Sequence, residues 1–197
     1  MNSFKEKGYY LEKNIISNDL CVFLYNYVKL KYKVFNTLSK HEYISLKNTD
    51  WGAKSDHMMK NTFCAYGDLA MDNLLTSIKS KVENITKLKL NESYSYLRLY
   101  KKGDTLYRHL DRKECAVSLT LNLGGHWPFY FIDKNNIQVK ANIAPGNALL
   151  YDGVKLVHWR EELKEKECVQ VFLHYVKKNK NKFDSRLHLG LPKIFAN

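Results

Sequence analysis

Apolar residues in the first third of the chain recur at the spacing of helices. One stripe follows Ser17, a residue type that caps helix N-termini, and consists of Leu20, Phe23, Leu24 and Tyr27. A second stripe predicts a helix from about Asp68 to Thr86 and consists of Leu69, Leu74, Leu75, Ile78, Val82 and Ile85. Residues 36–66 lie between the two stripes and have no clear period, so we expect an irregular segment there.

Apolar and polar residues alternate from Ser93 onward, which is typical of β-strands. The alternating segments are SYSYLRLY, AVSLTLNL, FYFI, NIQVKANI, NALLYDGVKLVHW and CVQVFLHYV. Turn-forming residues punctuate them: Gly103, Gly124, Gly125, Asn135, Asn136, Pro145, Gly146 and Gly153. About the last hundred residues therefore predict an all-β sandwich or barrel.

The order of the elements indicates the architecture. Helices come first and strands afterwards, which favours an α+β protein, mainly β, with its helices packed on a sheet, over alternating βαβ units. A chain of 197 residues without an internal repeat or a linker-like stretch fits one domain. We expect a helical part at about 1–90, a β core at about 91–177 and a basic C-terminal tail at 178–197.

The composition is that of a globular protein, but the chain is strongly basic. Hydrophobic residues make up 45% of it, which excludes a disordered chain, and the formal net charge is +12. Such a charge attracts nucleic acids and other acidic partners. Only five of the 32 basic residues are arginine, however, and Asn, Tyr and Ile are abundant, as AT-rich codon usage produces. We therefore favour a solvated lysine surface over a nucleic-acid interface.

No targeting or membrane segment is visible. The opening MNSFKEKGYYLEKN is polar, and no stretch of about eighteen apolar residues occurs. Cys21, Cys64, Cys115 and Cys168 are far apart and form no CxxC, which argues against a zinc ribbon and a disulfide scaffold. We expect a soluble cytoplasmic protein without membrane contact, and no feature predicts an oligomeric state.

One short motif is of a kind that binds metal ions. His109 and Asp111 form an HxD, and in an extended segment residues two apart project from the same face, so both can bind one ion. A later strand delivers His158. Two histidines and one carboxylate form the facial triad of non-haem Fe(II) oxygenases, whereas zinc hydrolases usually show a local HExxH, which is absent here.

Around these ligands the chain resembles the prolyl-4-hydroxylase-like group of 2-oxoglutarate- and Fe(II)-dependent oxygenases. The resemblance covers roughly residues 65–177 and includes YSYLRLYKKGDTLYRHLDRKECAVSLTLNL, HWPFYF, APGNALLYDGVKLVHWREEL and VQVFLHYV, in the family's order. It implies a double-stranded β-helix, or jelly roll, with iron held by His109, Asp111 and His158. It also implies the decarboxylation of 2-oxoglutarate to succinate and CO2, coupled through O2 to hydroxylation of a C–H bond, with ascorbate as a supporting reductant.

The co-substrate anchor departs from the family. Relatives usually carry Arg or Lys nine to eleven residues beyond the distal histidine, where this chain has Glu167, Cys168 and Val169. A tyrosine at the position of Tyr100 commonly contacts the co-substrate in relatives. The available cations are Arg98, two residues before Tyr100, then Arg160 and Lys166. We favour Arg160 and Arg98, because a planar guanidinium binds a carboxylate with two hydrogen bonds.

Several further polar residues lie near the predicted site. Ser118, Thr120 and Asn122 alternate with apolar residues on a strand expected to be central, which favours a polar lining that faces the co-substrate. Arg112, next to Asp111, fits a salt bridge or a substrate contact equally well. We expect His174 to be structural, and His41, His57, His126 and His188 receive no role.

The leading hypothesis is thus an oxygenase that acts on a peptidyl or small-molecule substrate. One alternative is an oxidative demethylase of nucleic acid, which the positive charge of the chain favours. Enzymes of that kind, however, carry a different set of motifs, with two arginines in the final strand. Another is a non-catalytic jelly-roll binding module with a structural ion or none. No motif in residues 36–66 identifies the substrate.

Overall fold

The computed structural model describes residues 3–45, 48–179, 184 and 186–192. Its helices are α1 (Ser3–Lys7), α2 (Asn18–Lys40), α3 (Leu69–Ser77) and α4 (Lys79–Thr86), with a short 3-10 turn, η1, at Lys113–Cys115. Ser17 caps α2 as predicted, because its side chain accepts a hydrogen bond from the backbone of Leu20. None of these helices is both long and apolar enough to cross a membrane.

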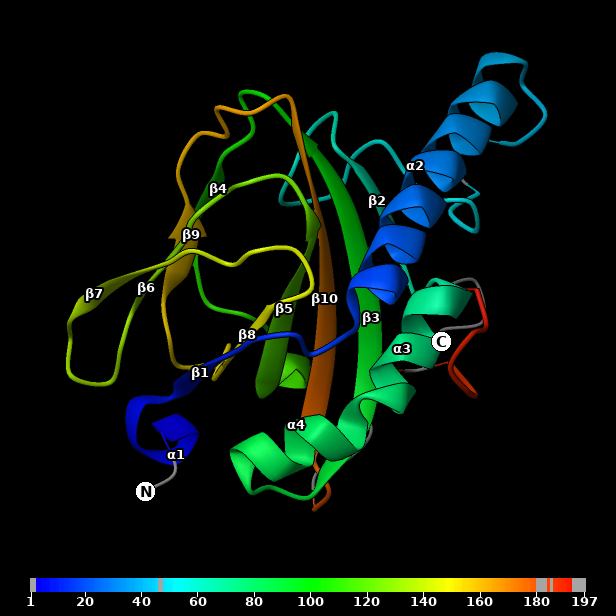
Figure 1. The fold of residues 1–197 in the computed structure, drawn as a ribbon. Coiled ribbons are helices and arrows are strands. Elements are labelled where there is room, and N and C mark those ends of the chain that lie inside the picture. The colour runs from blue at the N-terminus through cyan, green and yellow to red at the C-terminus, as the bar shows by residue number, and fades with distance from the viewer. Residues whose placement is uncertain (1–2, 46–47, 180–183, 185, 193–197) are drawn as a thin grey trace.

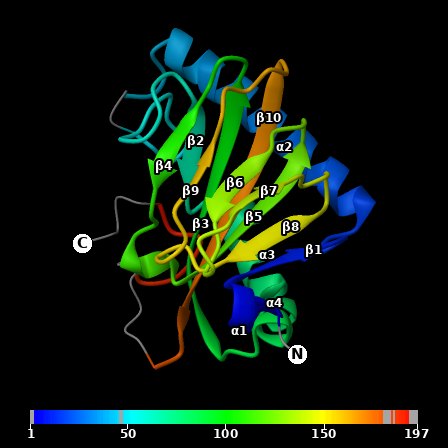
Figure 2. The ribbon, with the colours of Figure 1, turned by 90° about the vertical axis from the view of Figure 1, so that its left-hand side faces the viewer.

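Two antiparallel sheets face each other (Figures 1 and 2). The larger has the order β1-β8-β5-β10-β3-β2, and the smaller has the order β4-β9-β6-β7. The strands are β1 (Tyr9–Glu12), β2 (Phe63–Tyr66), β3 (Leu90–Lys101), β4 (Leu106–His109), β5 (Val117–Gly124), β6 (Phe129–Ile132), β7 (Gln138–Ala141), β8 (Ala148–Tyr151), β9 (His158–Arg160) and β10 (Glu167–Lys177).

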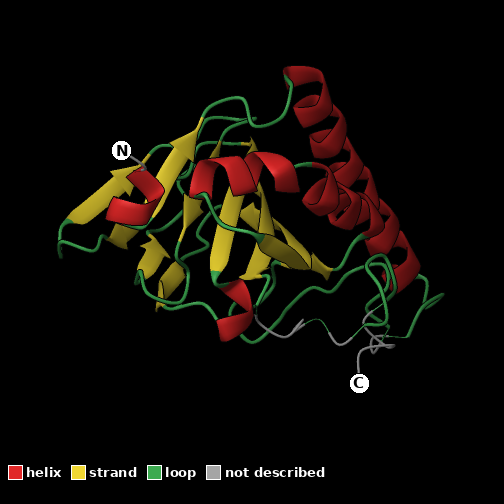
Figure 3. Ribbon diagram, turned by 90° about the horizontal axis from the view of Figure 1, so that it is seen from below, coloured by secondary structure: helices red, strands yellow, loops and turns green. Residues whose placement is uncertain are grey.

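Alternation along the long strands sorts side chains to the two faces of the larger sheet. Leu97 and Leu99 of β3 lie on the face of the larger sheet that the helices cover. With Val171 of β10 they join an apolar core that includes helix residues such as Leu75 and Val82. Figure 3 shows the helices gathered on this side. Two smaller apolar clusters lie elsewhere, one around Phe129 and Tyr151 and the other around Tyr100 and Trp127. The intervening residues of β3, β5 and β10 point between the sheets, and many of them are polar.

Three details differ from the sequence prediction. The part predicted to be helical contains two strands, β1 and β2, which pair with β8 and β3 at the two edges of the larger sheet. The predicted helix 68–86 is two helices separated at Ile78, whose backbone turns at φ −95° and ψ 0°. Helix α2 continues to Lys40, into the segment expected to be irregular.

One part of the C-terminal tail packs against the helices. Residues 180–183, 185 and 193–197 lie outside the described part of the chain, but Arg186 is fully buried. Its guanidinium forms ion pairs with Asp184 and with Asp72 of α3. The tail is therefore attached to the helical side of the larger sheet at this point.

Candidate metal centre

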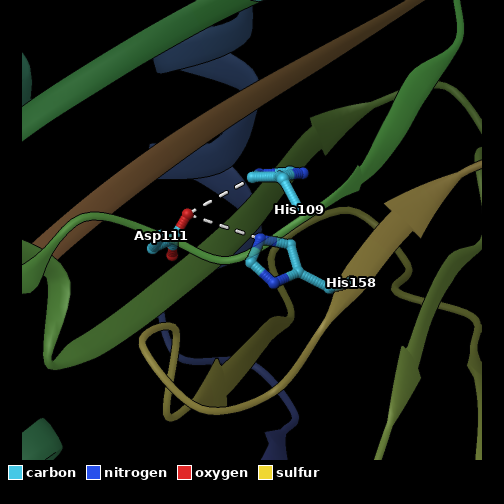
Figure 4. A group of neighbouring side chains, drawn as sticks. All are labelled: His109, Asp111 and His158. Carbon is cyan, nitrogen blue, oxygen red and sulfur yellow. Dashed lines mark ion pairs between the residues drawn. The ribbon is translucent and has the colours of Figure 1, made fainter.

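The smaller sheet brings together the three predicted metal ligands. His109 ends β4 and His158 begins β9, and the two residues are direct partners in the antiparallel register. Asp111 follows two residues after His109, where its backbone N–H donates to the carbonyl oxygen of Gly153 at 2.8 Å. One oxygen of Asp111, Oδ1, lies 3.4 Å from Nε2 of His158 and 3.7 Å from Nε2 of His109 (Figure 4).

A shared local contact orients both imidazole rings. Nδ1 of His109 lies 2.8 Å from the carbonyl oxygen of Tyr107, and Nδ1 of His158 lies 2.8 Å from that of Leu156. A carbonyl oxygen only accepts hydrogen bonds, so each Nδ1 must carry the proton. The unprotonated Nε2 of each ring therefore faces the carboxylate of Asp111.

This arrangement fits a bound cation. Two nitrogen lone pairs and a carboxylate oxygen repel one another unless a positive charge lies between them. Burial and the neighbouring His158 lower the pKa of His109, so protonation does not supply that charge at neutral pH. The ligand atoms all lie within 4.8 Å of one another, as a single metal ion requires.

Asp111 is held in its ionised form. Burial alone would raise the pKa of its carboxyl group, but the adjacent His158 ring and a hydrogen bond from Ser118 lower it. The hydroxyl of Ser118 donates to Oδ2 at 2.6 Å, which leaves Oδ1 for a metal. A Cβ atom at residue 153 would lie 2.2 Å from that Oδ2, so this close approach requires glycine at position 153.

His174 lies next to Ser118, which donates to the carboxylate of Asp111, and we expected a structural role for this histidine. Its ring is buried, Nδ1 lies 3.1 Å from the hydroxyl of Ser118, and the ring packs against Tyr94 at 4.6 Å. With Asp111 and Cys115 it forms a second group of possible ligands that shares the same carboxylate. The thiol of Cys115 lies 3.1 Å from the hydroxyl of Tyr94.

The triad opens into a cavity of about 480 Å³. Its wall is largely aromatic, with Tyr94, Tyr96 and Tyr100 of β3 on one side and Phe129 and Tyr151 on the other. The rings of Phe129 and Tyr151 also contact the His158 ring, at 5.4 and 4.9 Å. The far side is formed by residues of the 49–58 segment, which sequence patterns did not connect to the site.

One guanidinium lies in the interior without a carboxylate. Arg160 is fully buried and donates to the backbone oxygen of Trp127, to Thr120 Oγ1 at 3.3 Å and to Gln170 Oε1 at 3.2 Å. Among the described residues no carboxylate forms an ion pair with it, and its Nε has no hydrogen-bond partner. Burial lowers the pKa of Arg160, but a guanidinium remains charged at neutral pH. Such a charge calls for an anionic ligand.

Tyr100 and Arg98 lie close to this charge on the cavity wall. Tyr100 is fully buried, its hydroxyl has no hydrogen-bond partner, and its ring meets that of Trp127 at 4.6 Å. Burial raises the pKa of Tyr100 to about 12, which keeps the phenol protonated as a donor, although the charges of Arg98 and Arg160 oppose that shift. Arg98 forms an ion pair of 2.5 Å with Asp56.

The other candidates divide between the site and the surface. Ser118 and Thr120 face the interior but are not among the residues that line the cavity, so their role toward a co-substrate stays a prediction, whereas Asn122 donates to the backbone oxygens of Gly125 and Ile143 and so stabilises a turn. Arg112 lines the cavity and donates to the hydroxyl of Tyr94 at 2.9 Å. Lys166, the least favoured anchor, is exposed and does not line the cavity.

Two residues of the cavity, Asp56 and His57, were given no role from the sequence. Asp56 and His57 both line it, but they belong to a segment without a readable period. The only signal near them is the short apolar pair Met58 and Met59, which matches no strand or helix pattern. Their position depends on contacts with β3, which no local pattern records.

Comparisons with known proteins agree on the fold. No protein-family model and no curated sequence matches the chain. Among solved structures, a prolyl-4-hydroxylase from Pseudomonas putida is 12% identical, with a TM-score of 0.65 over 90% of this chain and 96% of that one. HygX from Streptomyces hygroscopicus, solved with nickel and 2-oxoglutarate bound, is 12% identical, with a TM-score of 0.59 over 91% and 86%.

A viral collagen prolyl hydroxylase from Paramecium Bursaria Chlorella virus-1 is 16% identical, with a TM-score of 0.58 over 87% of this chain and 97% of that one. These likenesses extend over nearly the whole length of each partner. They confirm the predicted architecture, helices on a double-stranded β-helix. The chain therefore has the fold of the 2-oxoglutarate- and Fe(II)-dependent oxygenases, including those of the prolyl-4-hydroxylase type.

Proposed function

We propose that the chain is an Fe(II)- and 2-oxoglutarate-dependent oxygenase that hydroxylates a C–H bond of a peptidyl or small-molecule substrate. The observation that carries this proposal is the convergence of two Nε2 atoms and one carboxylate oxygen in a cavity that also has a buried, unpaired guanidinium beside it. The shared fold supports the reaction class. All four cysteines are buried thiols, which fits the reducing conditions of the cytoplasm.

Charge balance supports 2-oxoglutarate as the co-substrate. Two neutral imidazoles and Asp111 would leave a ferrous ion with one net positive charge, and Arg160 contributes a second. 2-Oxoglutarate carries two negative charges and would compensate both. Arg98 is already paired with Asp56, so we assign the distal carboxylate to Arg160, with Tyr100 and Thr120 as neighbouring hydrogen-bond groups.

Each residue then has a defined task. Iron bound to the triad would supply the activation of O2 that couples decarboxylation of 2-oxoglutarate to hydroxylation. His109 and His158 would hold it through the nitrogens that their carbonyl contacts leave unprotonated, and Ser118 would keep Asp111 turned toward it. The rings of Phe129 and Tyr151 limit the access of water to His158.

The triad is tested by metal binding and by co-substrate turnover. We expect the wild-type protein to bind Fe(II) under anaerobic conditions and to release succinate from 2-oxoglutarate when O2 and ascorbate are added. His109→Ala, Asp111→Ala and His158→Ala should each abolish succinate release and weaken Fe(II) binding at least tenfold, because each removes one of three ligands. His126→Ala changes an exposed histidine outside the cavity and serves as the matched control.

A wild-type protein that binds Fe(II) no more tightly than His109→Ala would contradict the proposal and favour a non-catalytic binding module. Metal binding is measured by calorimetry, and succinate is measured by mass spectrometry. Circular dichroism of each variant checks that the fold is retained.

The proposed role of Arg160 in binding the distal carboxylate of 2-oxoglutarate is tested separately. Arg160→Gln removes the buried charge that we assign to the distal carboxylate, so the KM for 2-oxoglutarate should rise about a hundredfold, from the loss of roughly 3 kcal/mol. Fe(II) binding should stay within threefold of wild type, because Arg160 contacts no metal ligand. Lys166→Gln, on the surface, is the control. An unchanged KM for 2-oxoglutarate in Arg160→Gln would show that another cationic residue binds the distal carboxylate.

A further inference from the structure

We propose that Arg98 selects a substrate that carries a carboxylate group, and that it binds this group on the cavity wall beside the triad. The proposal rests on the proposed function and extends it to the class of substrate. It changes the role of Arg98 from co-substrate anchor to substrate recognition.

The guanidinium of Arg98 is held rigidly, with one edge unused. The residue is 6% exposed, and its Nη2 donates to Asp56 Oδ2 at 2.5 Å. Its Cζ lies 5.0 Å from the ring of Tyr96 and 5.8 Å from that of Tyr100, so the group lies close to two aromatic side chains. Its Nη1 is buried and has no hydrogen-bond partner. Because Arg98 lines the cavity, this donor is available to a molecule bound there.

Asp56 cannot satisfy that second nitrogen as well. Its Oδ2 also accepts from the hydroxyl of Tyr96 at 2.5 Å, and its Oδ1 accepts from the backbone N–H groups of Met58 and Met59, both at 2.9 Å. These bonds keep the carboxylate on one side of the guanidinium. Asp56 therefore orients Arg98 and leaves its other edge to a ligand, which reduces the cost of ordering the side chain on binding.

The charges around the cavity leave room for an anion. Arg98 lines it, together with Asp56 and Asp111. Asp111 would be neutralised by the metal, and 2-oxoglutarate would be neutralised by the metal and Arg160, so neither would repel an anion at Arg98. One guanidinium edge, on a group whose other edge is already paired with Asp56, matches a singly charged carboxylate better than a phosphate dianion.

The place of Arg98 suits a substrate. Arg98 and the proposed metal ligand His109 line the same cavity. Arg98 also donates to Asp56 of the 49–58 segment, which lines the cavity, whereas Arg160 is not among the lining residues. A molecule held there would lie between that segment and the metal.

The test uses two pairs of probes that differ only in charge. One pair is 4-hydroxyphenylacetate and its amide, which represent a free acid. The other is N-acetyl-Ala-Asp-Ala-amide and N-acetyl-Ala-Asn-Ala-amide, which represent an acidic side chain in a peptide. Each probe is titrated calorimetrically into the anaerobic protein loaded with Fe(II) and 2-oxoglutarate, and also into the metal-free protein. The pair that shows the preference identifies the source of the carboxylate.

We expect the acid member of one pair to bind at least tenfold more tightly than its neutral partner. Arg98→Gln should reduce this ratio to less than twofold and leave the KM for 2-oxoglutarate within threefold of wild type, and Arg98→Lys should restore part of the ratio. Arg108→Gln, an exposed arginine over Trp159, is the matched control and should behave like wild type.

Equal binding within both pairs would overturn the proposal, and so would a rise in the KM for 2-oxoglutarate in Arg98→Gln comparable to that in Arg160→Gln. Failure of the proposed function has a different signature. The wild-type protein would then fail to load Fe(II) or 2-oxoglutarate, whereas the charge preference of Arg98 would still be measured in the metal-free titration.

Discussion

The two histidines of the triad show how a local backbone contact prepares a side chain for metal binding. Each donates from Nδ1 to a carbonyl oxygen two residues before it. The spacing belongs to the strand itself, because a residue and its second neighbour lie on the same face. The strand therefore selects the tautomer, and the facing Asp111 lies where a third ligand of a bound metal would be needed.

Behind the triad, His174 makes the stability of the metal-free protein depend on pH. Its burial, the largest cause, lowers its pKa to about 4, against about 6.5 in an unfolded chain. Between these values the unfolded state binds more protons, so stability is complete above pH 6.5 and is lost as the pH falls toward 4. We expect the free energy of unfolding to decrease by on the order of 2–3 kcal/mol between pH 7 and pH 4.5.

Urea denaturation of the metal-free protein at a series of pH values measures this loss. His174→Gln keeps a polar group beside Ser118 but cannot titrate, so its stability should decline clearly less over the same range. The exposed His126→Gln should follow the wild type. An equal decline in His174→Gln and wild type would assign the pH dependence to other groups, such as His109, whose pKa burial also lowers.

At the scale of elements, a single carboxylate joins a helix, a strand and the C-terminal tail. Asp72 of α3 accepts from the backbone and hydroxyl of Ser95 in β3, at 3.2 and 2.6 Å. It also accepts from Arg186 at 2.9 Å and from the backbone of Gly190 at 2.8 Å. A buried carboxylate with four donors is well compensated, but its loss would leave the buried Arg186 with Asp184 alone.

Asp72→Ala should therefore lower the free energy of unfolding by about 3 kcal/mol, within the range observed when one partner of a buried ion pair is removed. Chemical denaturation measures the change, and proteolysis reports whether the C-terminal tail is released. Asn73→Ala alters the neighbouring exposed residue of the same helix and should change stability by less than about 0.5 kcal/mol. Similar stabilities of the two variants would show that Arg186 does not depend on Asp72.

Elements with a long repeating pattern were predicted well, and short ones were not. Helix α2 and strands β3, β5 and β10 each span several periods of their pattern. Strands β1 and β2 have four residues each and are stabilised by β8 and β3, far away in the sequence, so their local pattern carries little information. The bend at Ile78 was missed for a related reason, because the apolar stripe continues through it while α3 and α4 pack on the core separately.

Considered as a whole, the molecule separates its polar residues into two populations. Most of the excess positive charge is lysine, and 27 of the 32 basic residues are of this type. The buried guanidiniums are different: Arg98 lines the cavity, Arg160 is buried against Trp127 and Phe129, and Arg186 forms an ion pair with Asp72 of α3. The composition shows only that arginine is rare; the structure shows that three of the five arginines are buried.

The fold class and the residues of the candidate metal site could be predicted from the chain alone, from the alternation of the strands and from the HxD motif with a later strand histidine. Alternation predicts the strands, and the HxD with a later strand histidine predicts which side chains meet. The structure brings His109, Asp111 and His158 within contact as that spacing requires. Their role in catalysis remains a prediction for the experiments above.

The tasks of the arginines could not be separated in this way. Alternation shows that Arg98 and Tyr100 share a face, but the ion pair with Asp56 joins residues 42 positions apart, one of them in an irregular segment. The isolation of Arg160 depends likewise on which groups three different strands and a loop bring around it. Side-chain direction follows from local backbone geometry, whereas the partner of a buried charge is selected by long-range packing, and that packing exists only in the folded chain.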